Sequence, residues 1–170
     1  MTRSPRPVLL AAALLPLGAC GGGDRAPVHD TPLRDPVQLS ATADVDGKRY
    51  AFSGLGECHH TTDASIYELP AAMWTARLDA GAGDLAYVNL TLWQPKAAPE
   101  VQVSLGLTAG GRTHEIATVK GAPPHGSGVG RVEPAGPGGA LHVDGTDAEG
   151  RHVRLQVDCS RFTELVAEGG

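Results

Sequence analysis

The sequence contains few aromatic residues: only seven of its 170 residues are Phe, Trp or Tyr. It also has no apolar run of the roughly 20 residues with which a helix crosses a ~30 Å hydrocarbon core, and no run of Lys or Arg. Phosphate contacts need clustered basic residues, so we expect no nucleic-acid partner and no extended docking on anionic lipid. Because aromatic residues are few, a hydrophobic core must rely on Val, Leu, Ala and Ile, with Trp74 and Trp93 as its bulkiest members.

The amino-terminal segment has three physically distinct parts. Arg3 and Arg6 form a cationic start, Val8–Leu17 is apolar apart from Pro16, and small residues follow. The apolar run is too short to span a bilayer, and Pro16 and the following glycines would break a buried helix. This arrangement predicts a removable export signal over residues 1–19.

The end of that segment, Leu17-Gly18-Ala19-Cys20, resembles the lipobox of bacterial lipoproteins. The resemblance implies that Cys20 carries a diacylglyceryl thioether, becomes the mature amino terminus and is acylated, for example with palmitate. Stable anchoring takes more than one acyl chain, which such a cysteine supplies. The resemblance further implies a cell-envelope location, and Gly21 in place of Asp favours the periplasmic side of the outer membrane if the organism is diderm.

The mature chain is acidic. Removal of the signal takes away two of the 14 basic residues and none of the 19 acidic ones, which changes the net charge from −5 to −7. Residues 20–36 contain Gly, Pro and charges without an apolar period, which predicts a flexible linker. We expect one β domain over residues 37–165, a common single-domain size, and a disordered tail over residues 166–170.

Two cysteines remain once Cys20 is assigned to lipid. In an exported protein, Cys58 and Cys159 most simply form a disulfide. The bridge would close a loop of roughly 100 residues, for which the chain-entropy model gives about 4.7 kcal/mol. A reactive thiol or a Cys/His metal site is the alternative.

Alternation of apolar and polar residues predicts an all-β fold. Asp46-Gly47 is a two-residue hairpin signal, and at most a helical turn is expected over Thr62–Ala72. Seven or eight short strands with frequent turns indicate an antiparallel β-sandwich or barrel. The expected strands cover residues 37–45, 48–54, 73–78, 85–93, 101–107 and 112–120, followed by a Pro- and Gly-rich loop at 121–139 (with a short strand at 129–133 as an option) and a last hairpin that begins at Leu141 and ends with 153–159.

The last hairpin resembles the carboxy-terminal end of the mycobacterial LpqH-like lipoprotein antigens. The similar residues run from Ala140 to Asp147 and from Val153 to Ser160, where the strand ends in Cys-Ser. The resemblance covers roughly the last 20 residues of the domain. It implies a β-rich, disulfide-bonded, lipid-anchored envelope protein and supplies no site.

Glu57-Cys58-His59-His60 is the most ligand-capable cluster in the sequence. Imidazole and carboxylate groups suit zinc or copper, so His59 and His60 are candidate metal ligands. Neighbouring residues on a regular strand point to opposite faces, so both could ligate one ion only from a loop. A polar loop beside a structural disulfide is the simpler interpretation.

No catalytic motif stands out. Gly126-Ser127-Gly128 lies in a Pro- and Gly-rich loop without a following helix, unlike a nucleophile elbow. The acidic pairs Asp44/Asp46 and Asp144/Asp147 coincide with expected turns, where Asp is favoured for turn chemistry alone. We therefore expect no enzyme and no cofactor.

Tyr67 and Trp74 belong to a cluster of aromatic and aliphatic residues that is a candidate binding patch, since such composition is typical of contact cores. The alternative is that Trp74 fills the hydrophobic core. By elimination, the sequence predicts a non-enzymatic recognition or structural module, with an envelope protein as a candidate partner and an undetermined oligomeric state. A metal-handling lipoprotein and a small envelope hydrolase are the alternatives.

Overall fold

Ten β-strands and no helix make up the part of the chain that the structure, a computed structural model, describes: residues 33–66, 68–121 and 123–164. Within these ranges, then, no helix is long and apolar enough to cross a membrane. The strands are β1 (Val37–Val45), β2 (Lys48–Ile66), β3 (Leu69–Asp79), β4 (Leu85–Pro95), β5 (Gln102–Ala109), β6 (Arg112–Ala117), β7 (Ser127–Ala135), β8 (Gly138–Thr146), β9 (His152–Cys159) and β10 (Thr163–Glu164).

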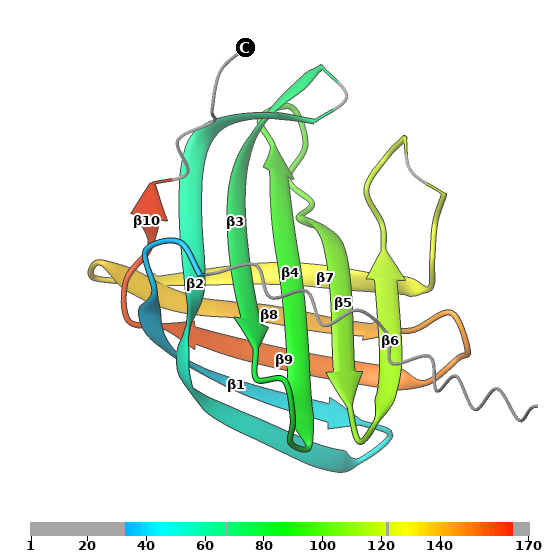
Figure 1. Cartoon of the computed structure of the whole chain (residues 1–170). Helices are drawn as coiled ribbons and strands as arrows, with labels where there is room; N and C mark the ends of the chain where they lie inside the picture. Colours follow the sequence, from blue (N-terminus) through cyan, green and yellow to red (C-terminus); the bar gives the residue numbers. More distant parts are fainter. Residues whose placement is uncertain (1–32, 67, 122, 165–170) are drawn as a thin grey trace, which may run out of the picture.

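Nine of the strands form one antiparallel sheet in the order β6-β5-β4-β3-β2-β1-β9-β8-β7, and β10 pairs in parallel with β2. The sheet folds over on itself, so that β3 to β6 cross in front of β1, β9, β8 and β7 (Figure 1). An isolated bridge joins Ala117, the last residue of β6, to His125, just before β7, and nearly closes the sheet into a barrel. The all-β antiparallel prediction is confirmed, with more strands than expected.

The long strand β2 belongs to both layers. Its first half, up to Gly56, pairs with β1, and its second half, from Glu57, pairs with β3. A Cβ atom on Gly56 would lie 2.3 Å from Leu39 Cδ2 and 2.6 Å from the Arg77 carbonyl oxygen. Glycine is therefore required where the strand passes between the layers, because only a residue without a side chain permits this approach.

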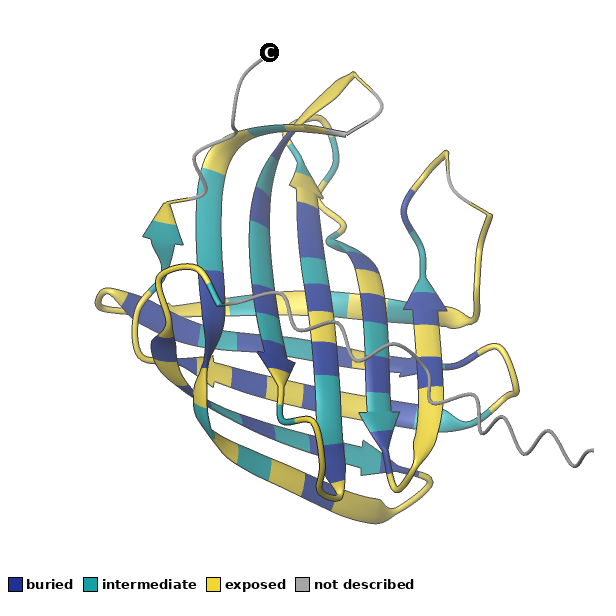
Figure 2. Cartoon of the chain, viewed as in Figure 1, coloured by how far each residue is buried: buried dark blue, intermediate teal, exposed yellow. Residues whose placement is uncertain are grey.

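The core lies between the layers and follows the period of two that the sequence predicts. Burial alternates along the strands (Figure 2), most regularly in β1 and β9. Of the two tryptophans expected as the bulkiest members of the core, one is buried and one is only partly buried. Trp93 is buried in a small separate cluster with Met73, and Trp74 is only partly buried at the edge of the main core. The largest fully buried side chains are aliphatic: Leu78, Leu85, Leu90, Leu92, Leu107, Ile116 and Leu141.

The predicted disulfide is present. Cys58 and Cys159 are joined across a sequence separation of 101 residues, with Cα atoms 6.2 Å apart. Cys58 is fully buried in the second half of β2, and Cys159 is the last residue of β9. The bond therefore ties the region where β2 changes layer to the end of the final long strand.

Two local predictions need correction. Thr62–Ala72 forms no helical turn: it is the β2–β3 hairpin, in which Ser65 pairs with Pro70 across the strand ends. The Pro- and Gly-rich stretch that was expected to be mainly loop contains β7 and the start of β8, joined at Gly136. In both places cross-strand pairing overrides a weak local pattern, because ladder hydrogen bonds tolerate unfavourable strand residues next to turns.

The predictions for the amino-terminal segment lie outside the described residues. These include the signal peptide over 1–19, lipidation of Cys20 and most of the linker; the tail over 166–170 also lies outside them. At its amino-terminal boundary the predicted β domain coincides with the start of β1 at Val37.

Candidate functional site

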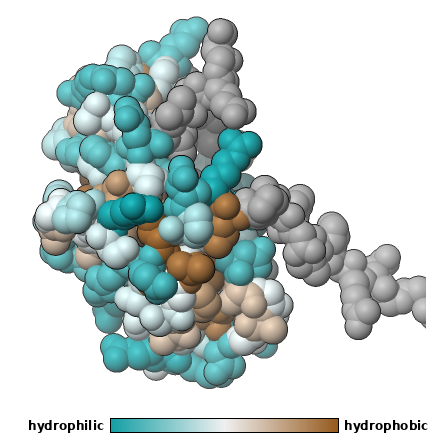
Figure 3. Space-filling view, turned by 60° about the vertical axis from the view of Figure 1, so that its left-hand side comes forward, coloured by the Kyte–Doolittle hydropathy of each residue, from teal (hydrophilic) through white to brown (hydrophobic). Residues whose placement is uncertain are grey.

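A hollow opens between the two layers, where β2 and β3 pass the β7–β8 turn and β10. Its volume is about 440 Å³, within the roughly 300–1,000 Å³ that is typical of small-molecule sites. Figure 3 shows a patch of apolar surface on the side of the molecule that lies to the left in Figure 1. We call this hollow the mouth; its lining includes three aromatic rings, two prolines and one carboxylate, from His60, Trp74, Phe162, Pro134, Pro137 and Glu164.

The aromatic rings of the mouth come from three separate strands or strand ends. The β2–β3 register places His60 opposite Trp74, and their rings stack with centroids 4.6 Å apart and an interplanar angle of 18°. The Phe162 ring stands at 59° to the His60 ring, 6.3 Å away. Trp74 and Phe162 are both partly buried against the main core, and the His60 and Phe162 rings form a corner in the lining of the mouth.

The disulfide holds both walls of this corner. Cys58 precedes His60 by two residues on β2, and Cys159 precedes Phe162 by three. Residues two apart on a strand share a face, so the disulfide and the His60 ring both point between the layers. The backbone N–H of Phe162 also donates to the Pro137 carbonyl at 2.8 Å, which joins this wall to the β7–β8 turn.

Partial burial in this aromatic setting lowers the pKa of His60 below its usual value of 6.5. Desolvation has this sign because it penalises the charged imidazolium. His60 is therefore neutral at pH 7 and contributes a flat ring to the mouth, without a positive charge.

His59 is engaged differently. Its Nδ1 lies 2.7 Å from Thr163 Oγ1, and Thr163 Oγ1 lies 3.2 Å from the Cys58 carbonyl oxygen. A threonine hydroxyl has one proton, so when Thr163 donates to the carbonyl, His59 Nδ1–H donates to Thr163. The pair of hydrogen bonds fastens β10 to β2, beside the mouth.

The lining of the mouth carries little charge. Glu164 is its only carboxylate, and the described lining residues include no Lys or Arg. Residues 33–66, 68–121 and 123–164 contain no group of three or more His, Cys, Asp or Glu side chains that could hold a metal ion. The mouth is thus an aromatic site with one acidic group.

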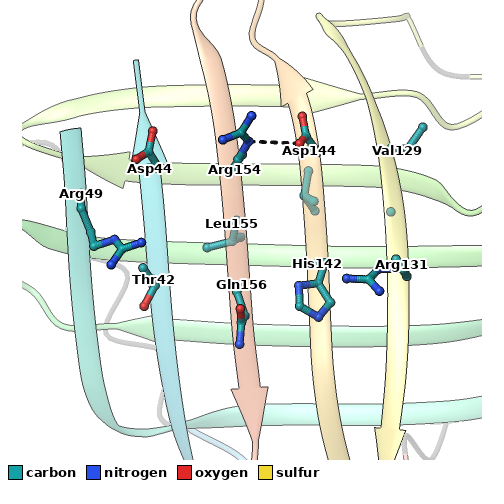
Figure 4. A pocket seen from close by; sticks show the side chains of 12 residues that line it. Thr42, Asp44, Arg49, Val129, Arg131, His142, Asp144, Arg154, Leu155 and Gln156 are labelled. Atoms are coloured by element: carbon teal, nitrogen blue, oxygen red, sulfur yellow. Dashed lines mark hydrogen bonds and ion pairs between the residues drawn. The ribbon is translucent and has the colours of Figure 1, made fainter. Parts of the chain in front are cut away.

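A second hollow, of about 580 Å³, lies on the outer face of β1, β7, β8, β9 and the first half of β2. Charges of opposite sign alternate across it in the order Arg49, Asp44, Arg154, Asp144 (Figure 4). Arg154 Nε donates to Asp144 at 3.2 Å, and His152 Nε2 lies 2.9 Å from the same carboxylate. Exposed pairs of this kind contribute little energy, and the third arginine of the lining, Arg131, pairs with Glu133. We interpret this face as solvated surface.

A buried hydrogen bond between a histidine and an aspartate joins the layers elsewhere. His114 on β6 and Asp147, just after β8, are each only 2% exposed, with His114 Nδ1 2.8 Å from Asp147 Oδ2. Arg151 Nε donates to the same oxygen at 2.9 Å, and the backbone N–H groups of Glu149 and Arg151 donate to Asp147 Oδ1. We call this group, His114, Asp147 and Arg151, the seam.

Hydrogen bonding decides the protonation of Asp147. Burial alone would raise the pKa of Asp147, but hydrogen bonds from His114 and Arg151 outweigh it and hold the pKa at about 2. Both carboxylate oxygens of Asp147 accept hydrogen bonds from within the protein. The seam is therefore a structural tie between β6 and the β8–β9 loop.

Sequence reasoning located part of the mouth. His60 and Trp74 belong to it, His59 does not line it, and Tyr67 lies outside the described residues. Phe162 and the prolines were missed, because no local pattern signals that the β7–β8 turn and the residues after Cys159 meet β2. No family model, no curated protein and no solved structure matches the chain.

Proposed function

We propose that this chain is a lipid-anchored cell-envelope protein that acts as a non-enzymatic recognition module and binds its ligand in the mouth. The observation that carries the proposal is the stacked His60–Trp74 pair with Phe162, which lines a hollow of small-molecule size between the layers. Ligand sites in β folds occur preferentially in such openings, where apolar walls meet a few polar groups.

The tether is supported by the sequence. A short cationic start, an apolar run and Leu17-Gly18-Ala19-Cys20 together resemble a lipoprotein signal. The Cys58–Cys159 bond is consistent with export, because disulfides persist in oxidising compartments. A domain anchored through its amino-terminal end would sample the nearby envelope surface for its ligand.

The anchoring part is tested by replacing the lipidated residue. In the native host, Cys20→Ala should abolish the diacylglyceryl mass and move the protein from the membrane fraction to the soluble fraction. A serine substitution at Thr31, also outside the domain, is the matched control and should leave both properties unchanged. Membrane attachment and an acylated mass that persist in Cys20→Ala would reject the tether.

The recognition part is tested by site-resolved photo-crosslinking in intact cells. A benzophenone amino acid placed at Thr62, beside the mouth, should capture an envelope component upon irradiation. The same group at Gln156, in the outer hollow, is the matched control because both positions belong to exposed strand surface. Capture from Gln156 but not from Thr62, or equal capture from both, would reject the mouth as the recognition site.

A further inference from the structure

We infer that the mouth binds a cationic group, an alkylammonium or a guanidinium, rather than an anion or a neutral sugar. The inference rests on the proposed function, because it assigns a ligand class to the same site. The juxtaposition that carries it is a corner of aromatic rings with one carboxylate, Glu164, and no Lys or Arg in the lining.

The charge of the lining excludes anions. A phosphate or carboxylate in the mouth would meet Glu164 without a Lys or Arg to compensate it. Binding of such anions normally uses guanidinium or ammonium partners. A cation, in contrast, would gain from the Glu164 carboxylate and from the net charge of −7 on the mature chain, which attracts cations at longer range.

The rings add a second attraction for a cation. His60 and Phe162 stand at 59° with centroids 6.3 Å apart, so a ligand in the corner contacts ring surfaces on two sides. The face of a Phe ring carries negative charge density and attracts ammonium and guanidinium groups within about 6 Å, so Phe162 supplies this attraction and His60 supplies a flat wall. The lowered pKa of His60 keeps this ring uncharged at pH 7, so it does not repel a cation.

Two polar groups at the mouth are already used within the protein. The Pro137 carbonyl accepts a hydrogen bond from the Phe162 N–H at 2.8 Å. The Thr163 hydroxyl is already held between His59 and the Cys58 carbonyl. Ammonium and guanidinium groups donate without accepting, and so suit the Glu164 carboxylate. A sugar would depend on the Thr61 and Thr62 hydroxyls, of which that of Thr62 already donates to Asp63.

The test uses a matched series of probes on the mature chain carrying Cys20→Ala, observed through its two indole N–H signals in NMR spectra. Trp74 stacks in the mouth, whereas Trp93 lies in the separate cluster and serves as the internal control. The probes are n-butylammonium, n-butylguanidinium, n-butanol, butyrate and N-acetylglucosamine. They share a small size and separate the effects of positive charge, apolar chain, negative charge and sugar.

We expect n-butylammonium or n-butylguanidinium to shift the Trp74 signal saturably, and n-butanol to bind about 10-fold more weakly, the loss expected for removing one cation–π and carboxylate contact. Butyrate and N-acetylglucosamine should neither shift the Trp74 signal nor displace a bound cation. Glu164→Gln should weaken cation binding severalfold and leave n-butanol binding unchanged. Phe162→Leu should also weaken cation binding.

Two further titrations, with Nα-acetyl-lysine amide and with spermidine, distinguish a protein side chain from a free polyamine as the source of the cation. Tighter binding of either supports the inference.

Three results would overturn the inference. The first is that n-butanol binds as tightly as n-butylammonium. The second is that N-acetylglucosamine or butyrate shifts the Trp74 signal more than the cations do. The third is that no cation shifts the Trp74 signal up to about 100 mM, a concentration far above the millimolar dissociation constants of weak specific ligands. Crosslinking from Thr62 in any of these cases would show that the mouth recognises another ligand class. Absence of crosslinking from Thr62 would instead reject the proposed function itself.

Discussion

The mouth and the seam lie at opposite ends of β8, and each contains a histidine that faces the other layer. His114 in the seam is buried and pairs with Asp147, which Arg151 also holds. His60 in the mouth is half-buried, stacks on Trp74 and has no carboxylate partner among the described residues. The comparison shows how the same side chain serves two purposes: a carboxylate partner and burial make it a tie, while an aromatic partner and access leave it available to a ligand.

The two ends are also held by different chemistry. The disulfide fixes the mouth, since Cys58 and Cys159 lie within three residues of its rings. Non-covalent hydrogen bonds fix the seam. If the disulfide stabilises only the mouth and the hydrogen bonds of Asp147 stabilise only the seam, variants at one end of the molecule should leave the other end unchanged.

The largest effect should come from removing the disulfide. Cys58→Ser with Cys159→Ser should lower the free energy of unfolding by about 2–5 kcal/mol, because the unfolded chain regains the freedom of a long loop. Urea denaturation of the oxidised and variant proteins measures the difference. The Trp74 indole signal should also shift, since one wall of the mouth is released. An unchanged Trp74 signal in a folded variant would show that the mouth does not depend on the bond.

Removing the histidine of the seam should have the next largest effect. His114→Ala removes one hydrogen bond from the buried Asp147 carboxylate, which keeps Arg151 and two backbone N–H donors, and a hydrogen bond to a charged group contributes about 1.5–3 kcal/mol. His60→Ala is the matched control and should cost only about 1 kcal/mol, the typical value of an aromatic pair. Equal losses in urea denaturation would contradict the division between a structural and an accessible histidine.

Acid should weaken the seam. The folded-state pKa of Asp147, about 2, lies below its unfolded value of 3.8, so its stabilisation is fully present above about pH 5 and is lost as the pH falls toward 2. The loss over this range should be about 2 kcal/mol, measured by urea denaturation at several pH values. Asp147→Asn should start less stable and show a flatter dependence on pH. A variant with the slope of the natural protein would assign the acid sensitivity to other carboxylates.

The smallest effect is the titration of His60. Because burial lowers its pKa below 6.5, protonation should occur only below that pH. An imidazolium stacked on an indole should then quench Trp74 fluorescence in a Trp93→Phe background. The quenching should disappear in His60→Gln. A midpoint at or above 6.5 would mean that the ring is more hydrated than its contacts indicate.

The strands and their faces could be predicted from the sequence because their signal is local. The alternation in 37–45 and 153–159 is visible in adjacent residues, and both segments are strands with the expected buried faces. The turn at Asp46-Gly47 is equally local: both residues have positive φ, 51° and 84°, as a two-residue hairpin turn requires. The end of β2 was placed too early, because nothing between Gly54 and Ile66 distinguishes a strand that changes partners from one that stops.

The sites depended on contacts that no local pattern reports. His60 and Trp74 are 14 residues apart and could be suspected from composition, but Phe162 reaches them only because β10 returns along β2. Asp147 was interpreted as a turn residue, which its backbone contacts confirm. Its partner His114 could not be found, since 33 residues and a layer crossing separate them.

The sequence by itself determined the all-β fold class, most strand positions and the pairing of Cys58 with Cys159. Hydrophobic period, turn chemistry and cysteine count are properties of short segments and of composition, so they can be recognised without the fold. Only the tertiary structure decided that β2 serves both layers, that a mouth opens beside the disulfide, and that one histidine is paired with a carboxylate while another stacks on tryptophan. The physical reason is that these features arise where the layers cross, between residues up to about 100 positions apart, and the geometry of that crossing depends on the packing of the whole core.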